Sequence, residues 1–240
     1  MHRFDWLSVI RRAMGLMDVL RPAKEVPTTR WSAEEPGTLR PRLKTLIVLI
    51  IGLWVFGTGD AILIAAGIGN TPWTVLAEGI AINIDWSVGQ ATFLVSVLVL
   101  LLWIPLREKP GIGTILNAII IAAAIEFMVP RLPTPETQSL AIAQVLLGVL
   151  LIGIGSGIYL TANLGPGPRD GWMTGLQRVS GVPIARVRGA IEGTVLVIGW
   201  LILGGTFGIG TIVFAVLIGP VVAVCLNLAG RLGGPGEVHG

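Results

Sequence analysis

Three carboxylates lie inside apolar stretches of the sequence: Asp60, Glu126 and Glu192. A charged side chain at the centre of a membrane-spanning helix costs about 2.5–3.5 kcal/mol on insertion scales, so each is a candidate for binding an ion or a polar ligand. Asp60 is flanked by Gly59 and Ala61, and nothing bulky prevents a helix, an ion or a substrate from approaching it. We favour a functional role for Asp60. The alternative is a carboxylate hydrogen-bonded to the Gly-rich turn of its own half of the chain.

The other two carboxylates have simpler interpretations. Glu192 follows Arg188 by four residues, which puts both side chains on one helix face. A structural ion pair near the cytoplasmic end is favoured, although Glu192 stays in the candidate binding site. Glu126 lies close to the end of its apolar stretch, so its carboxylate can reach the outer membrane interface.

Arg169 and Asp170 are further candidates. They lie at the start of a short segment later in the chain and follow a Gly-Pro pair. Free backbone N–H groups at a helix N-terminus, together with an arginine, can hold an anion. Nucleotide binding is not expected, because Pro166 and Pro168 remove two donors that a phosphate-binding loop would use and no strand precedes the turn. The alternative is an internal Arg169–Asp170 pair that fixes the turn.

The sequence lacks the residues that most familiar catalytic and metal-binding sites require. The two histidines are His2 and His239, at the ends of the chain, and Cys225 is the single cysteine. The apolar body therefore has no imidazole for a Ser-His pair, a zinc site or a haem ligand, and no disulfide can form within the chain. We expect no enzymatic activity, no metal and no cofactor. No basic surface interleaved with aromatic residues suggests a nucleic-acid partner.

The composition indicates an integral membrane protein of the all-α class. Hydrophobic residues make up 53% of the 240 residues, charged residues 13%, and the mean hydropathy is +0.81. In soluble domains about a quarter of the residues are charged. A spanning helix needs about 20 apolar residues. Six segments qualify, at about 43–66, 88–105, 112–129, 141–162, 187–204 and 210–229.

The basic residues predict the orientation of these six spans, because Lys and Arg in short connections favour the cytoplasmic side. Nine lie before or at the start of the first span, the last of them Lys44, and the connections at 67–87 and 205–209 contain none. Sixteen of the 17 basic residues fall on one side, and Arg131 is the exception. Both termini are therefore expected to be cytoplasmic.

The chain before the first span divides in two. Residues 1–20 combine an apolar stripe at helical spacing with several arginines, which suits either a helix on an anionic membrane surface or a basic tail without fixed structure. Residues 21–42 contain four prolines and are expected to form an irregular linker. Residues 230–240 are expected to form a flexible tail.

The membrane body contains an internal repeat, with a first copy at 43–129, an outer connection at 130–140 and a second copy at 141–229. The Gly-rich turn at 66–72 returns 96 residues later at 162–168, and Gly-Ile-Gly-Thr at 111–114 recurs unchanged at 208–211. Each copy contains three long spans, an odd number, so the second copy must be inverted relative to the first.

Each copy also has a segment too short to cross the bilayer, at 72–82 and at 168–179. Both begin with proline, which is tolerated in the first turn of a helix. We expect two short helices that enter the membrane from opposite faces as re-entrant elements. The alternative is that both lie in the interface, where Trp73 and Trp172 would serve as anchors.

Taken together, the Gly-rich turn and following residues at 164–171, Asn70-Thr71-Pro72-Trp73 and the doubled Gly-Ile-Gly-Thr resemble the YczE/YitT-type family of bacterial integral membrane proteins, most closely its YczE branch. The resemblance covers roughly residues 45–225. It implies a multi-pass protein of the bacterial cytoplasmic membrane, with the lipid bilayer as its partner. It brings no catalytic residues with it.

The expected function is transport of a small molecule or an ion through a site between the two inverted repeats. The short-helix N-termini would flank this site and Asp60 would contact the substrate or a coupling ion. The candidate binding residues are Asp60, Asn70, Thr71, Trp73, Arg169, Asp170 and Glu192. The rival hypothesis is a membrane-embedded interaction or regulatory protein without transport activity.

Overall fold

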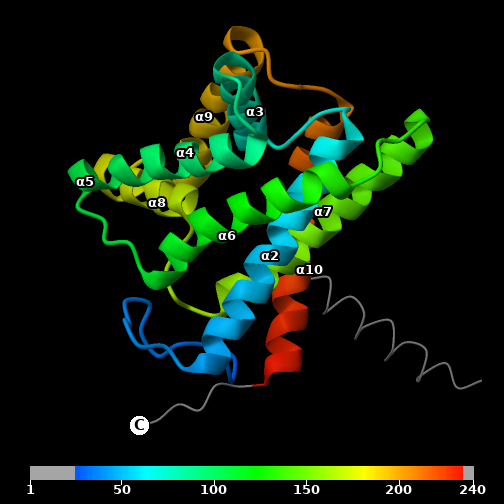
Figure 1. Ribbon diagram of the computed structural model, residues 1–240. Coiled ribbons are helices and arrows are strands. Elements are labelled where there is room, and N and C mark those ends of the chain that lie inside the picture. The colour runs from blue at the N-terminus through cyan, green and yellow to red at the C-terminus, as the bar shows by residue number, and fades with distance from the viewer. Residues whose placement is uncertain (1–24, 235–240) are drawn as a thin grey trace, which may run out of the picture.

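The computed structural model describes residues 25–234, which form helices and turns and contain no strand (Figure 1). The surface helix expected at 1–20 lies outside the described residues, as does the tail beyond residue 234. The first half of the membrane body comprises α2 (Leu43–Ala66), α3 (Pro72–Ile84), α4 (Val88–Leu101), α5 (Trp103–Leu106), α6 (Ile112–Met128) and η1 (Val129–Arg131). The second half comprises α7 (Gln138–Thr161), α8 (Pro168–Ser180), α9 (Ile184–Val197), η2 (Ile198–Ile202) and α10 (Ile209–Gly233).

Within the described residues, five helices are long and apolar enough to cross a membrane. They are Leu43–Ala66, Val88–Leu106, Ile112–Arg131, Gln138–Thr161 and Ile209–Gly233. The sixth expected span, 187–204, corresponds to α9 and η2 and is not among these five. This segment contains the charged residues Arg188 and Glu192, and α9 begins before it, so that Arg186 also lies on this helix.

The two halves meet where α2 and α7 pack along each other (Figure 1). Glycines allow this contact, and they are arranged reciprocally. A Cβ atom added to Gly59 would lie 2.7 Å from the carbonyl oxygen of Gly148, and one added to Gly155 would lie 2.6 Å from that of Gly52. Gly148 and Gly155 follow Gly52 and Gly59 by 96 residues, so equivalent positions of the two halves make equivalent contacts.

The doubled Gly-Ile-Gly-Thr sequence makes a second reciprocal contact. Gly113, at the start of α6, donates a backbone hydrogen bond to Leu164 in the Gly-rich turn of the second half (2.8 Å). Gly210, at the start of α10, donates the corresponding bond to Ile68 in the turn of the first half (2.9 Å). The two contacts lie at opposite ends of the molecule, since α6 begins at the lower end of Figure 1 and α10 at the upper end.

The repeat offset changes by one residue inside the second half, and the structure explains why. Val95 and Val99 of α4 share one hydrophobic cluster with Ile191 and Val195 of α9, each 96 residues later. Beyond this point the offset is 97, as in Trp103 and Trp200. The intervening η2 is a π-helix. Its wider turn accommodates one additional residue without breaking the helix.

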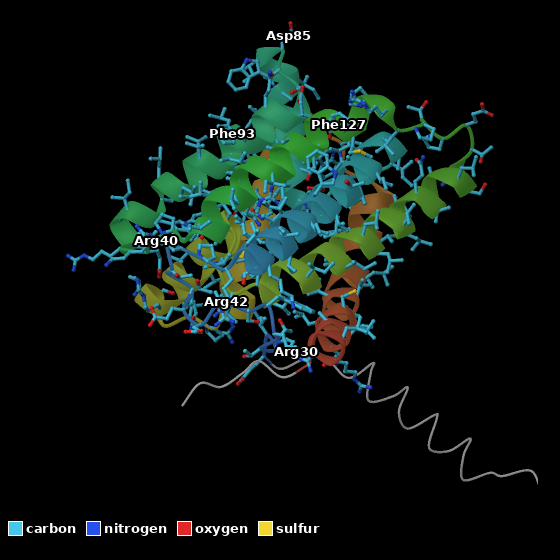
Figure 2. The ribbon with its side chains drawn as sticks, turned by 60° about the horizontal axis from the view of Figure 1, so that its bottom comes forward. Arg30, Arg40, Arg42, Asp85, Phe93 and Phe127 are labelled. Carbon is cyan, nitrogen blue, oxygen red and sulfur yellow. The ribbon has the colours of Figure 1, made fainter. Side chains whose placement is uncertain are left out.

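The segment before α2 has no helix within its described part, 25–42. It lies against the ends of α7 and α10, where the indole of Trp31 donates to the hydroxyl of Thr161 (3.0 Å) and Arg30 donates to the carbonyl of Gly233 (3.4 Å). The start of α2 and the end of α10 therefore lie at the same end of the molecule. Figure 2 shows Arg30, Arg40 and Arg42 at this end, away from Asp85.

Candidate functional site

A central cavity of about 560 Å³ lies between the two halves. Eight helices contribute to its wall: α2, α3 and α4, α6, α7 and α8, and α9 and α10. The N-termini of both short helices reach it, through Thr71 and Pro72 of the first half and Gly167 and Pro168 of the second. Its volume is within the range of about 300–1,000 Å³ that is usual for small-molecule sites.

One wall of the cavity is charged, and all of its charges come from the second half. Arg169 and Asp170 of α8 and Arg188 and Glu192 of α9 line it. Arg188 Nε donates to Glu192 Oε1 at 2.9 Å, which is the ion pair expected from their spacing. Asp170 Oδ2 accepts a hydrogen bond from the hydroxyl of Tyr159 at 3.3 Å.

The guanidinium of Arg169 is held by an aromatic ring rather than by a carboxylate. Its central carbon lies 5.1 Å from the centre of the Trp73 ring, and Trp73 packs edge-on against Trp172. Within residues 25–234 no hydrogen bond or ion pair reaches this guanidinium, so the internal Arg169–Asp170 pair considered above is absent there. A guanidinium has five N–H donors. Those of Arg169 are therefore available to a bound molecule.

The opposite wall is apolar and comes mainly from α10. Phe214, Ile218, Val222 and Leu226 line it at helical spacing, and Phe56 of α2 adds a second aromatic ring. A molecule in this cavity would meet charges on one side and aliphatic and aromatic groups on the other.

Asp60 lies behind the cavity wall, with none of its surface exposed. Its Oδ1 accepts from the Thr74 hydroxyl at 3.0 Å, and that hydroxyl lies 2.8 Å from the hydroxyl of Thr71. Because Thr74 uses its proton on Asp60, Thr71 donates to Thr74, and the chain of hydroxyls leads from the cavity to the carboxylate. Asp60 Oδ2 has no hydrogen-bond partner within the described residues. Arg169 supplies the nearest stabilising charge.

Asn70 is separate from the cavity and has a structural role. Its Nδ2 donates to Glu78 at 2.9 Å, and Glu78 also accepts from the backbone N–H and the hydroxyl of Thr206, at 2.7 and 2.9 Å. This cluster ties the loop before α10 to α3. Glu126 is also remote from the cavity, at the end of α6, where it accepts from the Ser87 hydroxyl.

The structure thus brings five of the seven candidate residues into one cavity, namely Thr71, Trp73, Arg169, Asp170 and Glu192, with Asp60 behind them. Sequence reasoning did not include other polar side chains that line the cavity: Thr92, Ser96, Asn117, Ser156, Tyr159 and Arg188. The repeat offset could have identified several of them. Thr92 and Ser96 precede Arg188 and Glu192 by 96 residues, and Ser156 follows Asp60 by 96.

Comparison with known proteins gives a family but no activity. Residues 43–227 match a family model described as a family of unknown function (DUF6198). An uncharacterised protein of Haemophilus influenzae is 40% identical over 212 residues, which cover 88% of this chain and 96% of the relative. The uncharacterised membrane protein YczE of Bacillus subtilis is 33% identical over 182 residues, covering 75% and 81%. No solved structure matches the chain.

Proposed function

For this chain, which belongs to the YczE-type DUF6198 family of membrane proteins, we propose a function in the transport of a small polar molecule across the bacterial cytoplasmic membrane. In this proposal the chain crosses the bilayer six times, as two inverted repeats with cytoplasmic termini. The central cavity is the binding site, and α3 and α8 are re-entrant helices that enter from opposite faces.

The reciprocal contacts between the halves support the inverted repeat. A two-fold axis that exchanges α2 with α7, and the start of α6 with that of α10, lies in the membrane plane if α2 and α7 both cross the bilayer. The sixth crossing is assigned to α9 and η2, residues 184–202. At 1.5 Å per residue this segment is about 28 Å long, close to the ~30 Å of the hydrocarbon core. Arg188 and Glu192 line the cavity, which suits charges within a span.

Two observations support the orientation. Sixteen of the 17 basic residues fall on the side assigned to the cytoplasm. In Figure 2 the labelled arginines of the segment before α2 gather at one end, whereas Asp85 lies at the other. This separation of charge is the one that biases insertion with the basic end inside.

The observation that carries the transport proposal is the polar cavity itself. It lies between the repeats, both short helices begin at it, and it contains an arginine without a polar partner in the described residues. Broken or short helices whose N-termini meet midway between inverted repeats are the usual arrangement of a transporter binding site. A protein that only packed helices or docked a partner would gain nothing from a cavity lined by charged side chains between its halves, because charges are costly within a membrane.

Water access tests this proposal. In a Cys225→Ala background, Ser96→Cys places a thiol in the cavity with little change in volume, and Leu98→Cys places one on the exposed side of the same helix. We expect a small impermeant thiol reagent to modify Ser96→Cys in vesicles of either orientation and to leave Leu98→Cys unmodified, because lipid suppresses thiolate formation. A cavity thiol that stays unreactive from both sides would contradict transport and favour the membrane-embedded interaction protein.

A further inference from the structure

We propose that the cavity binds a small zwitterion that carries a carboxylate, an ammonium group and an apolar side group, in the manner of an aliphatic or aromatic amino acid. This inference rests on the proposed function and names the substrate class of the same site. The carboxylate would bind at Arg169, the ammonium group at Asp170, and the apolar group along α10.

The charges of the cavity wall select both ionic groups. Arg188 and Glu192 pair with each other at 2.9 Å, which leaves one positive and one negative side chain, on the consecutive residues Arg169 and Asp170. Asp170 has a single hydroxyl donor, from Tyr159. Arg169 interacts electrostatically with Asp60 and Asp170, but within residues 25–234 no hydrogen bond or ion pair reaches its guanidinium. Polar groups without hydrogen bonds are costly away from water. An anion would add no donor to Asp170 and a cation would add no acceptor to Arg169, whereas a zwitterion supplies both.

The N-terminus of α8 strengthens the carboxylate side of the site. Its N-cap residue is Gly167, which offers no side-chain oxygen, so no cap occupies the first N–H groups of the helix. In α3, by contrast, the hydroxyl of Thr71 accepts from the backbone N–H of Thr74 (3.3 Å). Free donors and the positive end of the helix dipole both favour an anionic group. Gly167 and Pro168, at this helix start, line the cavity together with Arg169.

Asp60 acts on this site from behind the wall. It interacts electrostatically with Arg169 but lines no part of the cavity, so a ligand cannot contact it. Its charge would weaken the attraction of Arg169 for a carboxylate and strengthen that of the site for an ammonium group. If Asp60 fully neutralised Arg169, an amine without a carboxylate would bind as well as the zwitterion, and the test below separates the two cases.

The apolar wall sets a lower limit on ligand size. Phe214, Ile218, Val222 and Leu226 extend the cavity beyond the charged groups, and the volume of about 560 Å³ exceeds what a zwitterion without a side group would fill. Burying an aliphatic or aromatic side group against this wall should lower the Kd by roughly 10- to 100-fold. We therefore expect glycine to bind far more weakly than leucine or phenylalanine.

A matched set of probes tests the proposal with the purified full-length chain in nanodiscs. L-leucine is compared by titration calorimetry with 4-methylpentanoate, which lacks the amine, with 3-methylbutylamine, which lacks the carboxylate, and with glycine. L-phenylalanine is compared in the same way with 3-phenylpropanoate and phenethylamine. We expect at least one of the two amino acids to bind with a Kd at least tenfold lower than both of its fragments and than glycine.

Side-chain variants assign the two ionic contacts. Arg169→Gln should raise the Kd of the amino acid at least tenfold and leave the Kd of the amine fragment unchanged. Asp170→Asn should also raise the Kd of the amino acid, but it should leave the Kd of the carboxylate fragment unchanged. Arg186→Gln is the control, because Arg186 is exposed on α9 and does not line the cavity. Size-exclusion profiles and melting curves establish that each variant is folded. If Arg169→Gln does not fold, Arg169→Lys and the probe set on the unaltered chain still decide the question.

Each of the following outcomes of the binding and labelling measurements contradicts either the zwitterion proposal or the transport proposal. A carboxylate fragment that binds as tightly as its amino acid would show an anion site, and an amine that does so would show a cation site; either overturns the zwitterion. If no probe binds although Ser96→Cys is reached by water, the substrate class is wrong and the transport proposal stands. If Ser96→Cys is unreactive from both sides, the transport proposal itself fails.

Discussion

The two short helices begin alike and differ in what their first residues do. Both contain 13 residues and both start with proline, at Pro72 and at Pro168. In α3 the next residues are Trp73 and Thr74, whose hydroxyl donates to the buried Asp60. In α8 they are Arg169 and Asp170, whose charges line the cavity. The hydroxyl at the start of α3 thus bonds to a buried carboxylate, whereas the charged side chains at the start of α8 line the cavity.

The long helices differ in a corresponding way. In the first half α4 packs on α6, and a Cβ added to Gly89 would lie 2.9 Å from the carbonyl of Ala122. In the second half α9 and α10 have at most a weak contact, and a Cβ added to Gly189, Gly193 or Gly219 would meet nothing within 4 Å. The first half is therefore the more tightly packed one, and the charged wall and the looser helix pair both belong to the second.

This comparison depends on the inversion of the halves, and the largest predicted effect tests that. In a Cys225→Ala background, Lys109→Cys lies between α5 and α6 and Glu136→Cys between η1 and α7, and both positions are exposed. An impermeant thiol reagent added to intact cells should modify Glu136→Cys completely and Lys109→Cys only after permeabilisation. Labelling of both positions in intact cells would place the first-half connections on one side and remove the six-span arrangement.

We expect glycine substitutions to be costly at the contact between α2 and α7 and harmless on the loosely packed α9. Gly59→Ala would bring a Cβ to 2.7 Å from the backbone of α7, so α2 and α7 must separate, and we expect a loss of about 2–3 kcal/mol in the free energy of unfolding. Gly193→Ala adds a methyl group in open space on α9, and alanine favours a helix by up to about 1 kcal/mol over glycine. Unfolding in mixed micelles measures both. Equal losses would mean that α9 is packed as tightly as the centre.

The polar groups of the two halves should respond differently to the loss of one hydroxyl. Thr74→Val keeps the side-chain shape but removes the donor to Asp60, leaving a buried carboxylate without a hydrogen bond, at a cost of about 1–3 kcal/mol. Tyr159→Phe removes the donor to Asp170, which faces the cavity, where water can replace the hydroxyl. We expect a smaller loss for this variant. A larger loss for Tyr159→Phe than for Thr74→Val would make the second half the structural one.

Much of the fold could be predicted because its signals are local. Helix starts at Pro72 and Pro168 follow from Gly-rich turns and prolines, and five of the six long apolar runs match helices long enough to cross a membrane. The segment 187–204 is different, because it contains Arg188 and Glu192. Whether such charges face a cavity depends on neighbours far away in sequence.

The internal repeat predicts part of the candidate site, because it aligns residues of the first half with residues of the second. Trp73 and Arg169 are equivalent positions, and both line the cavity. Asn70 lies outside the cavity lining, and its sequence surroundings do not indicate this. Its partner Glu78 also accepts from Thr206, which lies 128 residues further along the chain than Glu78. Tyr159 carries no motif around it, and nothing in the sequence indicates that it faces Asp170.

The smallest predicted effect is the most direct test of the contrast between the two helix starts. Gly167→Ser should give α8 the side-chain cap that Thr71 gives α3, since the backbone at Gly167 (φ −61°, ψ 158°) is that of an N-cap. The added Cβ would lie 3.2 Å from the side-chain amide of Asn117, which must move by a few tenths of an ångström. A serine cap is worth about a few tenths of a kcal/mol over glycine, so the variant should unfold slightly later than the unaltered protein. The serine oxygen would occupy an N–H group that the proposed carboxylate uses, and binding of the amino-acid probe should weaken several-fold. Thr137→Ser, which keeps the existing N-cap of α7 and lies outside the cavity lining, should change neither quantity. A Gly167→Ser protein that is more stable and binds equally well would show that the free end of α8 takes no part in the site.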